Sequence, residues 1–316
     1  MDLGSWLGCW TVQWRGYAQA RSVQLAGVGL ASLLALHPVY GQRPPTPPYR
    51  LAAIRAYRYH NTNGTFSDTI VQRGSGAATA ASDSSDGTLV VLELQGQRGS
   101  YVPGRQVELM ARDDRQLLLN RRLEFAVFGD DGRYFAAFWL HGTRCSTVRL
   151  RAQLLGQTDA SAMEAQFPFP CSGGVTSAAP TSPPAAAGSV VPPYRITALR
   201  AYLFYGAGGT FSENVVQEGH TSLWNEQVSG SFVVVEIRGE DGWRAPARKV
   251  RLVGSEGQRV VFDRTVPVPA LGRDGRAFEG FWVYVHPCRP LTLRAQLLGQ
   301  ADSSAVEKFV PFDCGE

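Results

Sequence analysis

The chain has 316 residues, with 31 basic against 27 acidic side chains and a formal net charge of +4. Acidic residues are interspersed throughout the sequence, so it has no basic stripe of the kind that binds the phosphate backbone. This charge pattern excludes a nucleic-acid-binding protein.

Residues 1–41 are predicted to be a signal peptide or leader. An apolar run, Val23–Leu36, follows Arg21 and has the length of a signal-peptide core, which is short for a membrane span. A plausible cleavage follows Gly41. The alternative is an uncleaved membrane anchor, and the true start of the chain could lie further along. With cleavage, we expect an extracytoplasmic protein (secreted, periplasmic or at the cell surface) with no membrane span in the mature chain.

The remaining sequence contains one domain twice. After a proline-rich segment, 42–48, come repeat 1 (49–171), a linker rich in Ala, Ser, Pro and Gly (172–193), and repeat 2 (194–316). The string LRAQLLGQ occurs in both copies, and YRLAAIRAYRYHNTNGTFSDTIVQ parallels YRITALRAYLFYGAGGTFSENVVQ. Each copy is long enough for its own core, so we expect two domains on a flexible linker.

Both copies are typical of β-structure. Short β-branched stretches such as TLVVLEL and SFVVVEI are bounded by glycines, and turn sequences such as DDG and EDG recur along each copy. This pattern predicts an all-β fold with two tandem antiparallel β-sandwich domains, immunoglobulin-like in the broad sense. The cysteine that would precede the conspicuous Trp139 in an immunoglobulin domain is missing from the copy.

Alternation along YFAAFWL and AFEGFWV separates the aromatic residues between two strand faces. Trp139 and Trp282 fall on one face, which we expect to be the core. Phe138 and Phe281 fall on the other, which we expect to be partly exposed, with Glu279 beside Phe281.

The cysteines are consistent with export, where disulfides form. Cys9 would leave with the leader, and Cys145, Cys171, Cys288 and Cys314 remain. In each copy the pair is 26 positions apart with a turn-like segment at its midpoint. This spacing predicts a C-terminal hairpin with LRAQLLGQ as its first strand, closed by the disulfides Cys145–Cys171 and Cys288–Cys314. With no covalent bond across the linker, each domain should fold alone.

No catalytic residue, metal site or cofactor is predicted. The histidines of one copy are not repeated in the other, and the Asp-rich turns match no calcium loop. The repeated strand charges include Arg55 with Arg200, Glu93 with Glu236, and Arg151 with Arg294. A structural pairing of Glu93 is favoured over acid catalysis, because only one strand carboxylate recurs.

Trp224 and Trp243 lie in predicted loops of repeat 2 only, where exposed aromatic residues often contact ligands. They are the candidate ligand-binding residues. The sequence therefore favours a non-enzymatic exported protein for binding or surface interaction, whose partner is an extracellular protein or glycan. One alternative is a polysaccharide-acting enzyme or carbohydrate-binding accessory module with its site in repeat 2. Another is a structural subunit of an extracellular assembly.

Overall fold

The structure of the chain is a computed structural model. It describes residues 49–70, 85–101, 103–114, 116–125, 128–129, 131–141, 147–156, 162–167, 194–216, 222–224, 228–240, 247–272, 274–283, 290–300 and 304–314.

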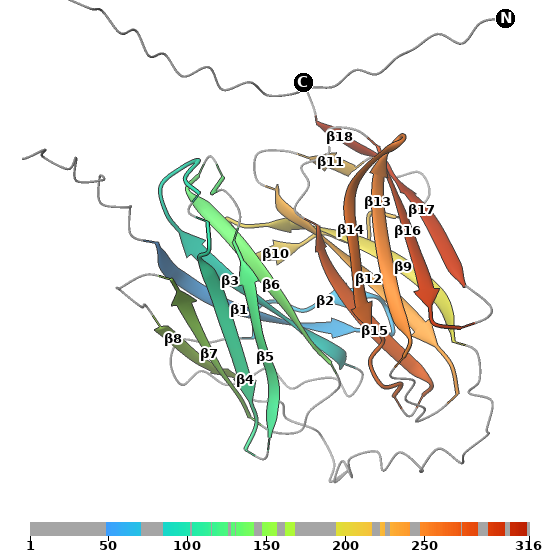
Figure 1. Ribbon diagram of the computed structural model, residues 1–316, viewed down its shortest axis with the longest axis horizontal. Helices are drawn as coiled ribbons and strands as arrows, with labels where there is room; N and C mark the ends of the chain where they lie inside the picture. Colours follow the sequence, from blue (N-terminus) through green and yellow to red (C-terminus); the bar gives the residue numbers. More distant parts are fainter. Residues whose placement is uncertain are drawn as a thin grey trace, which may run out of the picture. The chain divides into compact units, whose positions relative to one another are not determined.

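Repeat 1 consists of two four-stranded antiparallel sheets, whose strands are coloured blue to green in Figure 1. The sheet that faces the other repeat, called the inner sheet, has the order β2-β1-β3-β6. The sheet that faces away, called the outer sheet, has the order β5-β4-β7-β8. The strands are β1 (Arg50–His60), β2 (Thr65–Phe66), β3 (Ser85–Gln95), β4 (Gln106–Arg112), β5 (Leu117–Glu124), β6 (Arg133–His141), β7 (Val148–Leu155) and β8 (Ala162–Phe167).

Repeat 2 has the same two sheets, with inner order β10-β9-β12-β15 and outer order β14-β13-β16-β17. It also has a short parallel pair, β11 with β18. The strands are β9 (Arg195–Tyr205), β10 (Thr210–Phe211), β11 (Ser222–Trp224), β12 (Val228–Arg238), β13 (Lys249–Glu256), β14 (Arg259–Pro267), β15 (Arg276–Val283), β16 (Leu291–Leu298), β17 (Ala305–Val310) and β18 (Phe312–Cys314).

The expected all-β fold of tandem sandwiches is confirmed, and the described residues contain no helix. Alternation explains the outer strands: in β7, Val148 and Leu150 are buried while Arg149 and Arg151 are exposed. Each sandwich encloses its own apolar core, in which Val90, Leu109 and Leu150 are buried in repeat 1 and their counterparts in repeat 2.

The predicted C-terminal hairpin is confirmed in both copies. LRAQLLGQ supplies most of β7 and of β16, and each of these strands pairs antiparallel with the next strand in the chain. The registers are equivalent, because Val148 lies opposite Phe167 and Leu291 lies opposite Val310. Cys145, Cys171 and Cys288 lie outside the described residues, so the disulfides stay predictions.

The expectation for the aromatic faces was half wrong. Phe138 and Phe281 are only 2% and 1% exposed, since their face of the strand points into the sandwich core. Trp139 and Trp282 are buried as expected, but in a third core. Residues Pro47–Glu316 form one compact unit, and this third core contains side chains from both repeats.

In the described part of the chain, no helix is long and apolar enough to cross a membrane. The same residues contain no group of three or more His, Cys, Asp or Glu side chains that could hold a metal ion.

Candidate functional site

Side chains at corresponding positions of the two copies meet each other between the repeats. The outward faces of the two inner sheets pack together, and their buried side chains form the inter-repeat core. Its members are Tyr57, Tyr59, Leu89, Val91, Phe135 and Trp139 from repeat 1, and Tyr202, Phe204, Phe232, Val234, Phe278 and Trp282 from repeat 2. The twelve side chains occupy corresponding positions in the two copies, so the contact has the self-complementary form of a two-fold symmetric interface.

Two reciprocal hydrogen bonds show this symmetry. The Tyr57 hydroxyl donates to the Gly209 carbonyl at 2.8 Å, and the Tyr202 hydroxyl donates to the Gly64 carbonyl at 2.5 Å. Gly64 and Gly209 have left-handed φ angles of 65° and 63°, respectively, and each lies in the turn before a two-residue strand. A side chain at Gly64 would also collide with Arg200, because an added Cβ would lie 2.8 Å from its Nε. The corresponding sequences NGTF and GGTF therefore form turns whose glycine carbonyls accept hydrogen bonds from the other repeat.

Aromatic side chains fill the space between these turns. The indole nitrogen of Trp139 donates to the Phe278 carbonyl of the other repeat at 3.1 Å. The rings of Phe66 and Phe211, from the two short strands, lie 4.5 Å apart between centroids. Such contacts stabilise an interface beyond the area that they bury.

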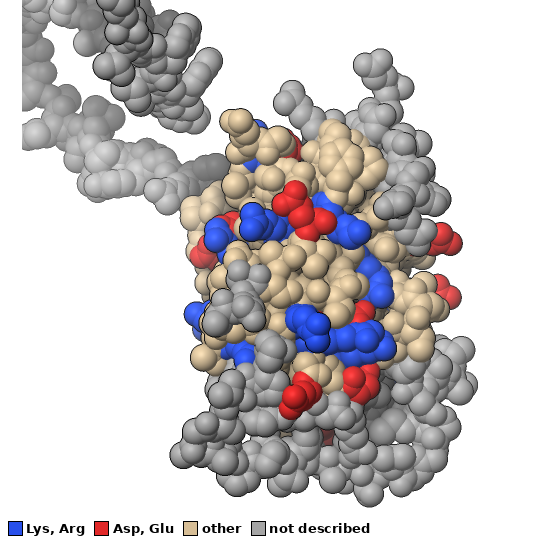
Figure 2. Space-filling view, turned by 90° about the vertical axis from the view of Figure 1, so that its right-hand side faces the viewer, with Lys and Arg blue, Asp and Glu red and all other residues tan. Residues whose placement is uncertain are grey.

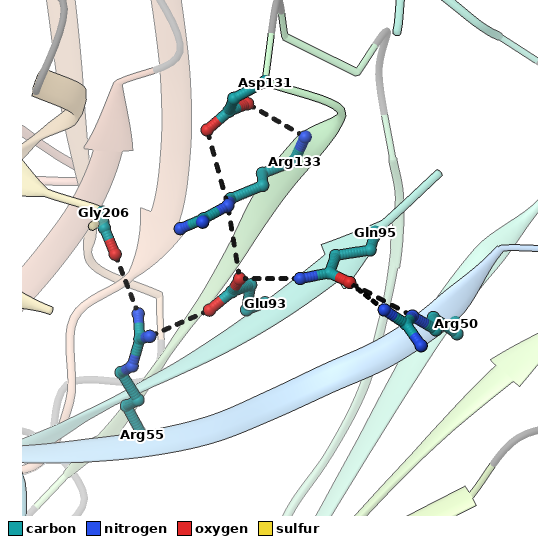
Figure 3. Close-up of polar contacts among 7 residues, drawn as sticks. All are labelled: Arg50, Arg55, Glu93, Gln95, Asp131, Arg133 and Gly206. Atoms are coloured by element: carbon teal, nitrogen blue, oxygen red, sulfur yellow. Dashed lines mark hydrogen bonds and ion pairs between the residues drawn. The ribbon is translucent and has the colours of Figure 1, made fainter. Parts of the chain in front are cut away.

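The repeated charges lie at the margin of this core. Figure 3 shows Glu93 between Arg55 and Arg133, with nitrogen–oxygen distances of 2.9 Å and 3.6 Å. Arg55 also donates to the Gly206 carbonyl of repeat 2 at 3.3 Å (Figure 3). The negative charge of Glu93 is thus paired within repeat 1, and its partner Arg55 also donates a hydrogen bond to repeat 2. This is the structural pairing that the sequence favoured.

Repeat 2 has an equivalent cluster. Glu236 contacts Arg200 at 3.4 Å and Arg238 at 2.9 Å, and Arg200 donates to the Tyr59 hydroxyl of repeat 1 at 3.0 Å. Burial alone would raise the pKa of Glu236, but hydrogen bonds from Arg238 and Thr197 and the charges of both arginines outweigh it and hold the pKa below its usual value. Glu236 therefore stays ionised and paired, which does not suit a general acid.

The two copies differ inside the inter-repeat core, and the differences compensate. Repeat 2 has Phe232 and Gly280 where repeat 1 has Leu89 and Ala137. An added Cβ on Gly280 would lie 2.3 Å from the Phe232 ring and 3.0 Å from Trp139. The larger phenylalanine thus occupies the space that the missing methyl group leaves.

One acidic and one basic group meet across the repeats without any repeated counterpart. The Nε2 of His141, at the end of β6, lies 3.3 Å from Oε2 of Glu279 in β15. The sequence placed Glu279 on a partly exposed face, but its side chain is only 2% exposed. Burial raises the pKa of Glu279 to about 8 and outweighs the charge of Arg121, a hydrogen bond from the Gly280 backbone and the charge of Arg264, which all lower it. Burial lowers the pKa of His141 and the charge of Arg121 lowers it further, while a hydrogen bond to the Phe278 backbone opposes both.

Of the two predicted ligand-binding tryptophans, the structure describes only the backbone of Trp224. Trp224 ends β11, where its backbone lies in register with Cys314 of β18. Trp243 lies outside the described residues. The structure therefore brings together the repeated Tyr, Trp, Arg and Glu residues, and it does not test the two loop tryptophans.

Sequence reasoning missed the inter-repeat core, although a signal for it was present. TLVVLEL and SFVVVEI are continuous apolar runs rather than alternating ones, which is typical of strands that are buried on both faces. In β3, Val90 and Leu92 point into the sandwich while Leu89 and Val91 point to the other repeat.

The comparisons with known proteins give no family. No protein-family model and no curated protein matches the chain. Among solved structures it is similar to red sea bream transglutaminase, with 10% identity, a TM-score of 0.23, and coverage of 78% of this chain and 32% of that one. It is also similar to a putative β-galactosidase from Bacteroides fragilis, with 8% identity, a TM-score of 0.23, and coverage of 84% and 41%. The chain spans less than half of either protein, and similarities at this TM-score carry no argument.

Proposed function

We propose that the chain is an exported, non-enzymatic protein whose two β-sandwich repeats dock into one module for binding or surface interaction. The observation that supports this proposal is the use of the repeated residues. The tyrosines and tryptophans that both copies keep on their inner sheets pack together between the repeats, and the repeated arginines pair with a glutamate of their own repeat while donating a hydrogen bond to the other. A docked pair of sandwiches offers a partner a preorganised surface, which lowers the entropic cost of binding.

The partner that we propose is an extracellular protein or glycan. Figure 2 shows basic and acidic side chains mixed with a larger uncharged area on the face that it presents. On the outer sheet of repeat 2, Arg251 donates to Asp263 at 2.8 Å, while Phe309 and Val260 are exposed. A mixed surface of this kind suits protein or glycan contacts better than a polyanion.

An activity screen tests the non-enzymatic part of the proposal. The purified full chain is incubated with glycosidase, esterase and peptidase substrates, and then applied to a glycan array and to extracellular protein extracts from its own source. We expect saturable binding without turnover. Robust turnover of any of these substrates would overturn the proposal, if the activity copurifies with the monodisperse chain.

A second candidate function is carbohydrate binding or processing by repeat 2. It is supported by the β11–β18 pair, which carries Trp224 and has no counterpart among the described residues of repeat 1. Glycan binding that is lost in both Trp224→Ala and Trp243→Ala would favour this function, and binding that survives both substitutions would exclude these tryptophans as the site. Electron microscopy of the native cell surface would instead reveal a structural subunit of an extracellular assembly.

A further inference from the structure

The contact between Glu279 and His141 joins the two repeats through residues that do not recur in the other copy. Tyr57 and Tyr202 form equivalent bonds in both directions, but the positions that correspond to Glu279 and His141 are Ala136 and Tyr284. Each copy therefore carries one half of this pair. The pair forms only when repeat 2 docks on repeat 1.

The surroundings of Glu279 are unfavourable for a carboxylate. It lies on the same face of β15 as Ala277 and Phe281, two members of the apolar core of repeat 2. A buried ionised carboxyl costs free energy unless it is paired and hydrogen-bonded. The charged or titratable groups that face it are His141 from β6, Arg121 from β5 and Arg264 from β14.

We propose that Glu279 and His141 form a proton-dependent latch between the repeats, which is closed while the pair shares one proton and loosened when the pair loses that proton or gains a second. With one proton, the Glu279 hydroxyl donates to the free lone pair of the His141 imidazole, and both groups are uncharged. Loss of the proton leaves a buried carboxylate against a lone pair. Gain of a second proton removes the acceptor, because the imidazolium carries hydrogens on both nitrogens. The latch does not depend on the proposed function.

The folding stability changes with pH because the pKa of each group differs between the folded and the unfolded chain. The pKa of Glu279 is raised from 4.5 to about 8 in the folded chain, so its contribution to stability is complete below pH 4.5 and is lost as the pH rises through about 8. The pKa of His141 is lowered from 6.5, so its contribution is present above pH 6.5 and is lost as the pH falls below it. The His141 side chain is 36% exposed, so solvent makes the loss of stability at low pH smaller than the loss that Glu279 causes at high pH.

Urea unfolding of the full chain at a series of pH values tests whether ionisation of Glu279 lowers the folding stability. Glu279→Gln keeps the shape of the protonated carboxyl and cannot ionise. Relative to this variant, the unfolding equilibrium constant of the wild type should rise by up to about tenfold per pH unit over the window in which one proton is released. The exposed Glu307→Gln on β17 is the matched control and should follow the wild type. Parallel pH profiles for the wild type and Glu279→Gln would overturn the proposal.

A second measurement locates the effect at the interface and needs no variant. Hydrogen exchange, corrected for its intrinsic pH dependence, is followed by mass spectrometry from about pH 6 to about pH 9. We expect a loss of protection in β6 and β15, which carry the pair, and unchanged protection in β7, which lies in the outer sheet of repeat 1. Equal loss in all three strands, or in none, would contradict a latch. If Glu279→Gln does not fold, Glu279→Ala replaces it in the urea series, because repeat 1 has alanine at the corresponding position.

Discussion

The Tyr57 hydroxyl of repeat 1 donates a hydrogen bond of 2.8 Å to the Gly209 carbonyl of repeat 2, and Tyr202 returns the same bond to Gly64. Burial raises the pKa of both phenols, so they remain donors across the physiological range. Two copies of one domain thus bind each other through the same residues, as the halves of a homodimer would.

Removing either hydroxyl should weaken the docking. Tyr57→Phe and Tyr202→Phe each leave a buried carbonyl without its donor, which costs about 1 to 3 kcal/mol. Urea unfolding of the full chain measures the effect. Tyr101→Phe, at an exposed tyrosine, is the control and should change little. Wild-type stability in both buried variants would show that these bonds do not hold the repeats together.

The space around Gly280 makes a sharper test. Gly280→Ala should destabilise the chain by about 1 to 3 kcal/mol, because the added methyl group overlaps the Phe232 ring. Phe232→Leu in the same chain should recover part of the loss, since Leu with Ala is the combination that repeat 1 already has. A double variant no more stable than Gly280→Ala would contradict this account of the packing.

Much of each sandwich could be predicted from the sequence, because alternation and turn residues act locally. The hairpin containing LRAQLLGQ was found in this way, and so was the burial of Trp139. Phe138 was misplaced because alternation separates two faces but does not reveal that both are covered. The contact between Glu279 and His141 could not be predicted, since neither residue recurs and they lie in different repeats.

That each domain folds alone stays a prediction, and the inter-repeat core adds a second prediction for an isolated repeat. An isolated repeat 1, residues 49–171, would expose the face that carries Tyr57, Phe135 and Trp139 to water. We expect it to self-associate, because large exposed apolar faces drive association. Light scattering after size-exclusion chromatography measures this, and coexpression with residues 194–316 should give a one-to-one complex. A stable monomer of repeat 1 would mean that the docking is dispensable.

The disulfides predicted from cysteine spacing remain to be tested. Non-reducing peptide mapping should find Cys145–Cys171 and Cys288–Cys314, and Cys145→Ser should lower stability by roughly 3 kcal/mol for a loop of this length. The described hairpin registers are equivalent in the two copies, which supports equivalent bonds. A peptide that joins a cysteine of repeat 1 to one of repeat 2 would contradict the prediction.

The docking of the two repeats is tested most directly at the indole N–H of Trp139, which donates to the Phe278 carbonyl of the other repeat. Its signal in the nitrogen–proton NMR spectrum of the full chain can be assigned by its absence in Trp139→Phe. We predict slow exchange with solvent and a nuclear Overhauser contact to Phe278, because the side chain is only 3% exposed and lies in the inter-repeat core. An indole proton that exchanges as fast as a free one, with no contact to repeat 2, would contradict the docking.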